Sequence, residues 1–296
     1  MSETSETIIF FGNEQLATGV STTAPTLQKL LAAGYHVAAV VTKRPLEITA
    51  VAEAHGIPVL LPTKPTDIIE QLRGFGASLG VLVAYGRMVP QSIIDLFPRG
   101  IVNIHPSLLP LHRGPTPVES VILAGETETG VSLMRLAAAM DAGPVFAQQT
   151  MAVGSLSKQA LADKLLLLGS DLLLQHLPAI LSGQLEPAAQ DDSRATYDKL
   201  ITKDDGLLDW QKPVTVLERQ VRAYAGWPRS QATLGSTDVI ITAAHASPAQ
   251  GEVGQIWIEN KQFGIYCAEG SLVIDQLIPA GKKEMPAAAF LAGYQL

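Results

Sequence analysis

The sequence predicts an α/β protein of two domains, a doubly wound and mostly parallel sheet followed by a small domain of antiparallel strands. Two observations predict the first domain: short β-rich runs alternate with helical stretches, and these runs are apolar throughout. Strands that are apolar on both faces belong to parallel sheets covered by helices on both sides. The third observation is a series of short runs, separated by glycine and polar turns, beyond Trp210. These runs predict a small antiparallel barrel or sandwich.

The elements follow one another from the first apolar run, TIIFF. Strands of the first domain are expected at residues 7–11, 36–41, 58–62, 79–86 and 101–104, with helices at 26–33, 48–55 and 67–73 and a long helix that ends near Leu181. A polar, turn-rich stretch then predicts a linker. We therefore expect a first domain at 1–183, a linker at 184–204 and a second domain at 205–296. The second domain should contain a helix at 214–224 and strands at 238–244, 251–259, 263–269 and 271–278.

Composition limits the classes of partner and compartment. The formal net charge is -7, which argues against a DNA-binding protein, because nucleic-acid binders usually carry a basic surface. Cys267 is the only cysteine, so an internal disulfide is excluded, as is typical of the cytoplasm. The N-terminus has no pattern of a signal peptide. The leucine-rich stretch that ends near Leu181 contains charged residues, which predicts a packed helix and no membrane association.

The segment IVNIHPSLLPLHRGPTP contains the strongest candidate site. Asn103 and His105 are two positions apart on a predicted strand, so their side chains point to the same side. In parallel sheets the ligand lies beyond the carboxyl ends of the strands, which is where these residues fall. An amide that donates a hydrogen bond and an imidazole that moves a proton suit a carbonyl that gains negative charge. The prolines and glycine that follow predict a rigid loop over the strand end.

Asp141 is a second candidate, in the stretch MDAGPV. Aspartate before glycine is common in ordinary turns, but beside His105 it would orient the imidazole and stabilise its cationic form. The remaining histidines have no metal-ligand spacing, so we expect no metal site. The first strand is not followed by Gly-x-Gly-x-x-Gly, so a nicotinamide cofactor is not expected.

NIHPSLLP, then Arg113-Gly114, then MDAGPV together resemble the folate-dependent formyltransferase family. The resemblance implies that Asn103, His105 and Asp141 are catalytic. It also implies that Ser107, Leu108, Leu109 and Pro110 contact the folate. The formyl donor would be 10-formyltetrahydrofolate and the acceptor a primary amine.

The second half bears on the acceptor. TYDKLITKDDGLLDW, VRAYAGWP and LIPAGKKEM resemble stretches of the methionyl-tRNA formyltransferases, a branch of this family in which the second domain is an OB-like barrel. This implies initiator methionyl-tRNA as partner, with Arg44, Arg113, Lys282 and Lys283 as candidate contacts. Arg113 could instead pin its loop.

Two departures leave other acceptors open. The basic loop that these enzymes insert after the second strand is reduced here to Lys43 and Arg44 in VVTKRPLEITAVAEAHGIP. From Asp205 onward the sequence contains seven basic and nine acidic residues, whereas phosphate contacts need positive charge. An amino-sugar nucleotide is therefore the alternative acceptor. A folate- or RNA-binding relative without turnover is the third hypothesis.

Overall fold

The computed structural model describes residues 6–17, 24–44 and 47–296. The chain divides into two compact units. The first unit is formed by the chain up to Val118 together with Thr127–Gly154 and Gln159–Lys199. The second unit contains Glu119–Glu126, Ser155–Lys158 and Leu200–Leu296. Pro45 and Leu46, which belong to the shortened loop after the second strand, lie outside the described residues.

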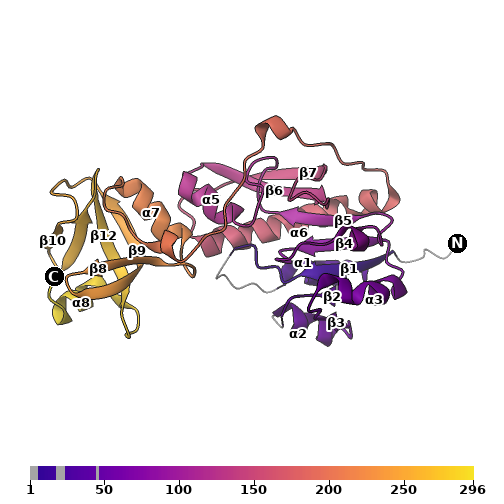
Figure 1. Ribbon diagram of the computed structural model, residues 1–296, viewed down its shortest axis with the longest axis horizontal. Coiled ribbons are helices and arrows are strands. Elements are labelled where there is room, and N and C mark those ends of the chain that lie inside the picture. The colour runs from indigo at the N-terminus through magenta and orange to yellow at the C-terminus, as the bar shows by residue number, and fades with distance from the viewer. Residues whose placement is uncertain (1–5, 18–23, 45–46) are drawn as a thin grey trace. The chain divides into compact units, whose positions relative to one another are not determined.

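The first unit is built on a seven-stranded sheet in the order β3-β2-β1-β4-β5-β6-β7 (Figure 1). Its strands are β1 Thr7–Gly12, β2 His36–Val41, β3 Val59–Leu60, β4 Leu79–Val83, β5 Ile101–His105, β6 Glu128–Arg135 and β7 Val145–Ala152. The first five pair in parallel, while β6 runs antiparallel to β5 and β7 antiparallel to β6. The predicted doubly wound, mostly parallel sheet is therefore confirmed.

Helices cover both faces of this sheet. They are α1 Pro25–Ala32, α2 Glu47–Ala54, α3 Ile69–Gly74 after a 3-10 turn at Pro65–Ile68, α4 Gln91–Ile94 and α6 Lys158–Ser182. Helix α5, Pro117–Ala124, belongs from Glu119 onward to the second unit. One face packs through Ile9 and Phe11 against Leu72 of α3 and Ile93 of α4. On the other face α6 lies so close to β5 that a Cβ added at Gly169 would fall 2.4 Å from Ile104. Alternate residues along the strands thus pack against the helices on the two faces.

Helix α6 is the leucine-rich element of the sequence. It is long and apolar enough to cross a membrane by length and composition, and half of its most apolar window is buried inside the protein. Leu161, Leu165, Leu173 and Leu177 are completely buried. The burial agrees with a packed helix, as the charged residues in the sequence predict.

Glu14 lies at the start of the connection between β1 and α1. It follows β1, is completely buried, and accepts hydrogen bonds from the backbone N–H groups of Thr26 (2.8 Å) and Leu27 (3.0 Å). Burial raises the pKa of this carboxyl group, and the hydrogen bonds from the start of α1 oppose that shift. Glu14 therefore ties the end of β1 to the first turn of α1.

The second unit contains a six-stranded sheet in the order β10-β11-β12-β9-β8, with β13 paired to β12. Its elements are α7 Val214–Ala223, β8 Ser230–Leu234, β9 Thr237–Ser247, β10 Ile256–Glu259, β11 Gln262–Tyr266, β12 Ser271–Pro279, β13 Met285–Pro286 and α8 Ala287–Gly293, after a 3-10 turn at Asp204–Gly206. All strand pairs are antiparallel. The core joins Leu217 of α7, Phe263 and Leu272 of the sheet, and Phe290 of α8. The predicted second β domain is confirmed, with β8, β13 and α8 as additional elements.

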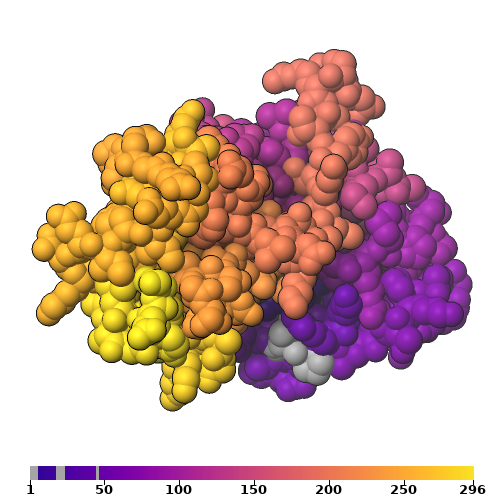
Figure 2. Space-filling model, turned by 60° about the vertical axis from the view of Figure 1, so that its left-hand side comes forward, coloured from indigo at the N-terminus to yellow at the C-terminus, as the bar shows by residue number. Residues whose placement is uncertain are grey.

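The segment expected to be a linker belongs largely to the first unit, which includes residues up to Lys199. Ala188 pairs with Val145 of β7, and Thr196 donates its N–H to the carbonyl oxygen of Pro110. A 3-10 turn at Asp192–Arg194 is exposed, and the segment, salmon in Figure 2, lies at the molecular surface. Side-chain and backbone contacts thus fix much of this polar stretch. The boundaries at 183/184 and 204/205 stay a prediction.

Candidate active site

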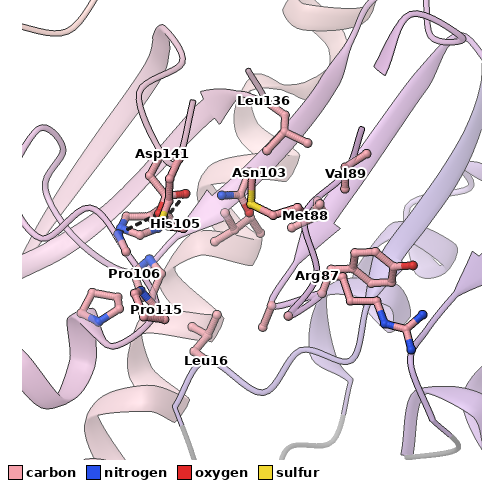
Figure 3. Close-up of a pocket in the computed structure, with 18 of the residues that line it drawn as sticks. Leu16, Arg87, Met88, Val89, Asn103, His105, Pro106, Pro115, Leu136 and Asp141 are labelled. Carbon is pink, nitrogen blue, oxygen red and sulfur yellow. Dashed lines mark hydrogen bonds and ion pairs between the residues drawn. The ribbon is translucent and has the colours of Figure 1, made fainter. Parts of the chain in front are cut away.

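A cavity of about 630 Å³ lies at the carboxyl ends of β1, β4 and β5 (Figure 3). Its wall is formed largely by short segments that follow the sheet strands, namely 13, 15–17, 43–44, 84–89, 105–106, 136–137 and 139–141, with residues 114, 115 and 117 of the proline-rich loop. This is the position at which open α/β sheets bind ligands. Asn103, His105 and Asp141 all line it.

Asn103 and His105 are held by β5 at the centre of the sheet. They lie opposite Met134 and Ser132 of β6, and they are 6% and 4% exposed. The intervening Ile104 packs on the opposite face against α6. The carboxamide of Asn103 has no side-chain hydrogen bond within the described part of the chain. It is therefore available to a ligand in the cavity.

The two ring nitrogens of His105 have different surroundings. Nε2 lies 2.9 Å from the carbonyl oxygen of His112, and because a carbonyl only accepts, Nε2 carries the hydrogen. Nδ1 lies 3.7 Å from Oδ1 of Asp141, which is too far for a direct hydrogen bond. In the neutral imidazole Nδ1 is then the proton-accepting nitrogen, and a proton placed there faces a carboxylate.

Asp141 is oriented by its own loop. Its backbone is in the left-handed region, with φ 48°, and its Oδ2 accepts the N–H of Gly114 at 2.9 Å. Its carbonyl oxygen accepts a hydrogen bond of 2.8 Å from Nε2 of Gln190. These contacts leave Oδ1 directed at His105, as Figure 3 shows.

Comparison with known proteins agrees with this arrangement. Residues 21–177 match the family described as formyl transferase, and residues 200–295 match the formyl transferase C-terminal domain. The chain belongs to the formyl transferase family. Methionyl-tRNA formyltransferase of Trichlorobacter lovleyi is 36% identical, over 98% of this chain and 94% of that protein. The enzyme of the same name from Chloroflexus aurantiacus is 38% identical, over 97% and 96%.

Solved structures share the fold. An N-formyltransferase from Helicobacter canadensis, in complex with folinic acid and dTDP-3-aminofucose, superposes with a TM-score of 0.71 at 16% identity, over 95% of this chain and 99% of that one. HypX from Aquifex aeolicus in complex with tetrahydrofolic acid gives 0.69 at 18% identity, over 96% of this chain and 46% of HypX. The formyl transferase chain thus spans about half the length of HypX.

The loop expected to contact folate makes hydrogen bonds within the first unit. Ser107, Leu108, Leu109 and Pro110 are absent from the cavity wall. The hydroxyl of Ser107 donates to the carbonyl oxygen of Leu111, and the N–H of Leu109 donates to Oγ of Ser132. These polar groups hold the loop against β6. The assignment of folate contacts to these four residues stays a prediction that the cavity wall does not favour.

The segment from Ala84 to Val89 lines the cavity instead, and the sequence interpretation missed it. Tyr85 is 2% exposed and packs edge-on against Phe11 at 5.9 Å. Burial raises the pKa of its hydroxyl group, and Arg87 opposes that shift. Met88 is exposed at the cavity. The rule that ligands lie at carboxyl ends of strands could have found this segment, since it follows β4.

The candidate acceptor contacts fall in different places. Arg44 lines the cavity, where its guanidinium donates to Oε1 of Gln15 at 3.4 Å. Lys282 and Lys283 are exposed in the turn after β12 of the second unit.

Arg113 is buried below the loop. Its guanidinium donates to Gln190 (3.1 and 2.8 Å), Tyr197 (2.9 Å) and Asp192 (2.6 Å). Four of the five N–H groups of this side chain donate inside the first unit, so the side chain pins the loop. The geometry therefore favours the pinning role over the acceptor contact.

Proposed function

We propose that this protein transfers the formyl group of 10-formyltetrahydrofolate to the amino group of initiator methionyl-tRNA. The observation that carries the proposal is the convergence of Asn103, His105 and Asp141 on one cavity at the carboxyl end of the sheet. The acceptor is supported by the methionyl-tRNA formyltransferases, whose similarity extends over both units. The structures solved with sugar nucleotides are below 20% identical and support the fold alone.

In this proposal the acceptor nitrogen attacks the formyl carbon directly. A new C–N bond forms, and the formyl oxygen takes negative charge in a tetrahedral intermediate. The amide N–H of Asn103 donates to that oxygen. Loss of one such donor lowers the rate by about 10²–10³. The bond from carbon to the folate nitrogen then breaks, which releases tetrahydrofolate.

His105 and Asp141 handle the proton of the attacking amine. Nδ1 of His105 accepts it, directly or through a water molecule, and the proton is later delivered to the departing folate nitrogen. Oδ1 of Asp141, 3.7 Å from Nδ1, stabilises the charged imidazole meanwhile. Acid–base assistance of this kind contributes roughly 10²–10⁴ in rate.

The two substrates must meet at this point. We propose that the segment from Ala84 to Val89 forms the folate side of the cavity, since all six of its residues line the wall and apolar side chains are typical of such sites. Arg44 at the cavity is a candidate contact to the phosphate backbone of the acceptor stem, and Lys282 with Lys283 forms a second basic pair. These contacts would operate within a chain whose net charge is -7.

The experiment is a direct comparison of acceptors. The protein is incubated with 10-formyltetrahydrofolate and either methionyl-initiator tRNA, the same tRNA uncharged, or an amino-sugar nucleotide. We expect formyl transfer only to the charged tRNA, with Asn103→Ala as the matched control that should lose it. Formylation of the sugar alone would overturn the acceptor, and formylation of neither would overturn catalysis and leave a binding protein.

A further inference from the structure

A second histidine–aspartate pair, His112 and Asp198, is connected to the proposed catalytic pair by a hydrogen bond between His112 and His105. Nδ1 of His112 donates to Oδ1 of Asp198 at 3.0 Å, and the two side chains are only 12% and 8% exposed. These residues are 86 positions apart in the sequence and both belong to the first unit. Neither side chain lines the cavity. The pair can therefore act on the site only through another residue.

The backbone of His112 provides that connection. Its carbonyl oxygen accepts the hydrogen of Nε2 of His105 at 2.9 Å, while its own N–H donates to Oγ1 of Thr196 at 2.7 Å. The φ angle is 57°, a left-handed conformation that is uncommon for residues with a side chain. Such a conformation persists only where the surroundings hold it.

Asp198 is itself fixed in place, so it can hold the conformation of His112. Its backbone N–H donates to the carbonyl oxygen of Arg113 at 2.8 Å, so it is fixed beside the loop that contains His112. Its Oδ2 is buried and has no hydrogen-bond partner among the described residues. A buried carboxylate is costly unless it is paired, and His112 provides the side-chain partner of Asp198 at 3.0 Å.

Two oxygens compete to decide which nitrogen of neutral His105 carries the hydrogen. Asp141 favours a hydrogen on Nδ1, whereas the carbonyl of His112 favours a hydrogen on Nε2. We propose that His112 is a positioning residue: its side chain, anchored by Asp198, aims its carbonyl at Nε2 and so keeps Nδ1 of His105 free to accept a proton. This inference rests on the proposed function only for the catalytic role of His105.

Three substitutions of His112 separate the side chain from the backbone. His112→Gly accepts the left-handed conformation but removes the anchor to Asp198. His112→Asn tolerates the same conformation, and its amide N–H can donate where Nδ1 does. His112→Ala loses both the anchor and the conformational tolerance. Asp198→Ala removes the anchor from the other side, and Asp198→Asn keeps an accepting oxygen.

The decisive measurement is the ¹⁵N NMR spectrum of the histidine rings in the full-length protein, with the His105 signals assigned by their loss in His105→Gln. We expect the hydrogen on Nε2 in the wild type and in His112→Asn, and a shift of the hydrogen toward Nδ1 in His112→Gly and Asp198→Ala. This readout does not depend on any formyl transfer, so it remains informative even if the proposed activity fails.

Kinetics provide the second measurement. We expect kcat to fall roughly 10–100-fold in His112→Gly and Asp198→Ala with little change in KM, which is the size of loss known for removing the partner that orients a metal-ligating histidine. The two losses should not add in the double variant, because both break one contact. The proposal is overturned if His112→Gly keeps the wild-type tautomer of His105, if His112→Asn loses as much as His112→Gly, or if the losses add. Should His112→Gly fail to fold, Asp198→Ala against Asp198→Asn decides by the same signals.

Discussion

Replacing Arg113 with methionine distinguishes loop pinning from acceptor binding. Methionine retains most of the aliphatic packing but removes every hydrogen bond that the guanidinium donates. The two bonds to Oε1 of Gln190 matter most, because the side chains of Asp192 and Tyr197 are largely exposed and contribute little. A hydrogen bond that involves a charged group contributes about 1.5–3 kcal/mol. Counting the Gln190 contact as one such interaction, we expect a loss of about 2 kcal/mol in the free energy of unfolding.

The assay is thermal unfolding, followed by steady-state kinetics. A loss of about 2 kcal/mol corresponds to a Tm decrease of roughly 4–8 °C for a unit of this size. Arg73→Met is the matched control, because that arginine makes only an exposed pair with Glu70 and should stay within about 0.5 kcal/mol of wild type. An unchanged Tm in Arg113→Met, together with a raised KM for the acceptor, would refute the pinning role and restore Arg113 as a substrate contact.

Three other predictions follow from the site and from the second unit. Asn103→Ala should lower kcat by about 10²–10³ with an unchanged Tm, measured in single-turnover formyl transfer, and a smaller loss would argue against an oxyanion contact. His105→Ala should lower kcat by roughly 10²–10⁴, and near-normal activity in that variant would remove His105 from the mechanism. Lys158 is completely buried, and its Nζ lies 3.7 Å from Oε1 of Glu119. We expect the stability of the protein to fall less when both side chains of this pair are replaced than when one is. In denaturant unfolding we expect Lys158→Met to cost about 3–5 kcal/mol and Lys158→Met/Glu119→Leu to recover most of it; equal losses in both variants would contradict this.

The sheet could be predicted where hydrophobicity alone decides the structure. Residues 36–41 form β2 with the expected bounds, because an apolar run between polar turns has few other solutions in a covered sheet. The strand expected at 79–86 ends at Val83 instead. Ala84 adopts φ 51° and turns the chain into the cavity. Since Ala84 and Tyr85 continue the apolar run, and neither is a glycine or a proline, the pattern does not show this turn.

The site could be predicted in part. The spacing of Asn103 and His105 on one strand is visible in the sequence, and the structure places both in the cavity wall. The end of β6 lies opposite Val102, at the start of β5, and the loop after β6 brings Asp141 to His105. Spacing alone cannot reveal this fold of the loop, so Asp141 was a candidate in the sequence but its catalytic role depended on the family resemblance. Gln190 and Asp198 lay in a stretch that looked like a linker. Contacts between residues about eighty positions apart leave no periodic signal in a single sequence.

Glu14 has a consequence for what this scaffold can be turned into. The first turn of the first crossover helix is where related sheets hold the phosphates of a nucleotide, because its free N–H groups attract an anion. Here a carboxylate from the chain itself occupies two of those donors. Grafting a glycine-rich loop onto this position would not by itself recruit a dinucleotide, because the incoming phosphate would have to displace a resident anion. Redesign toward nucleotide chemistry would therefore begin by neutralising or shortening this one side chain.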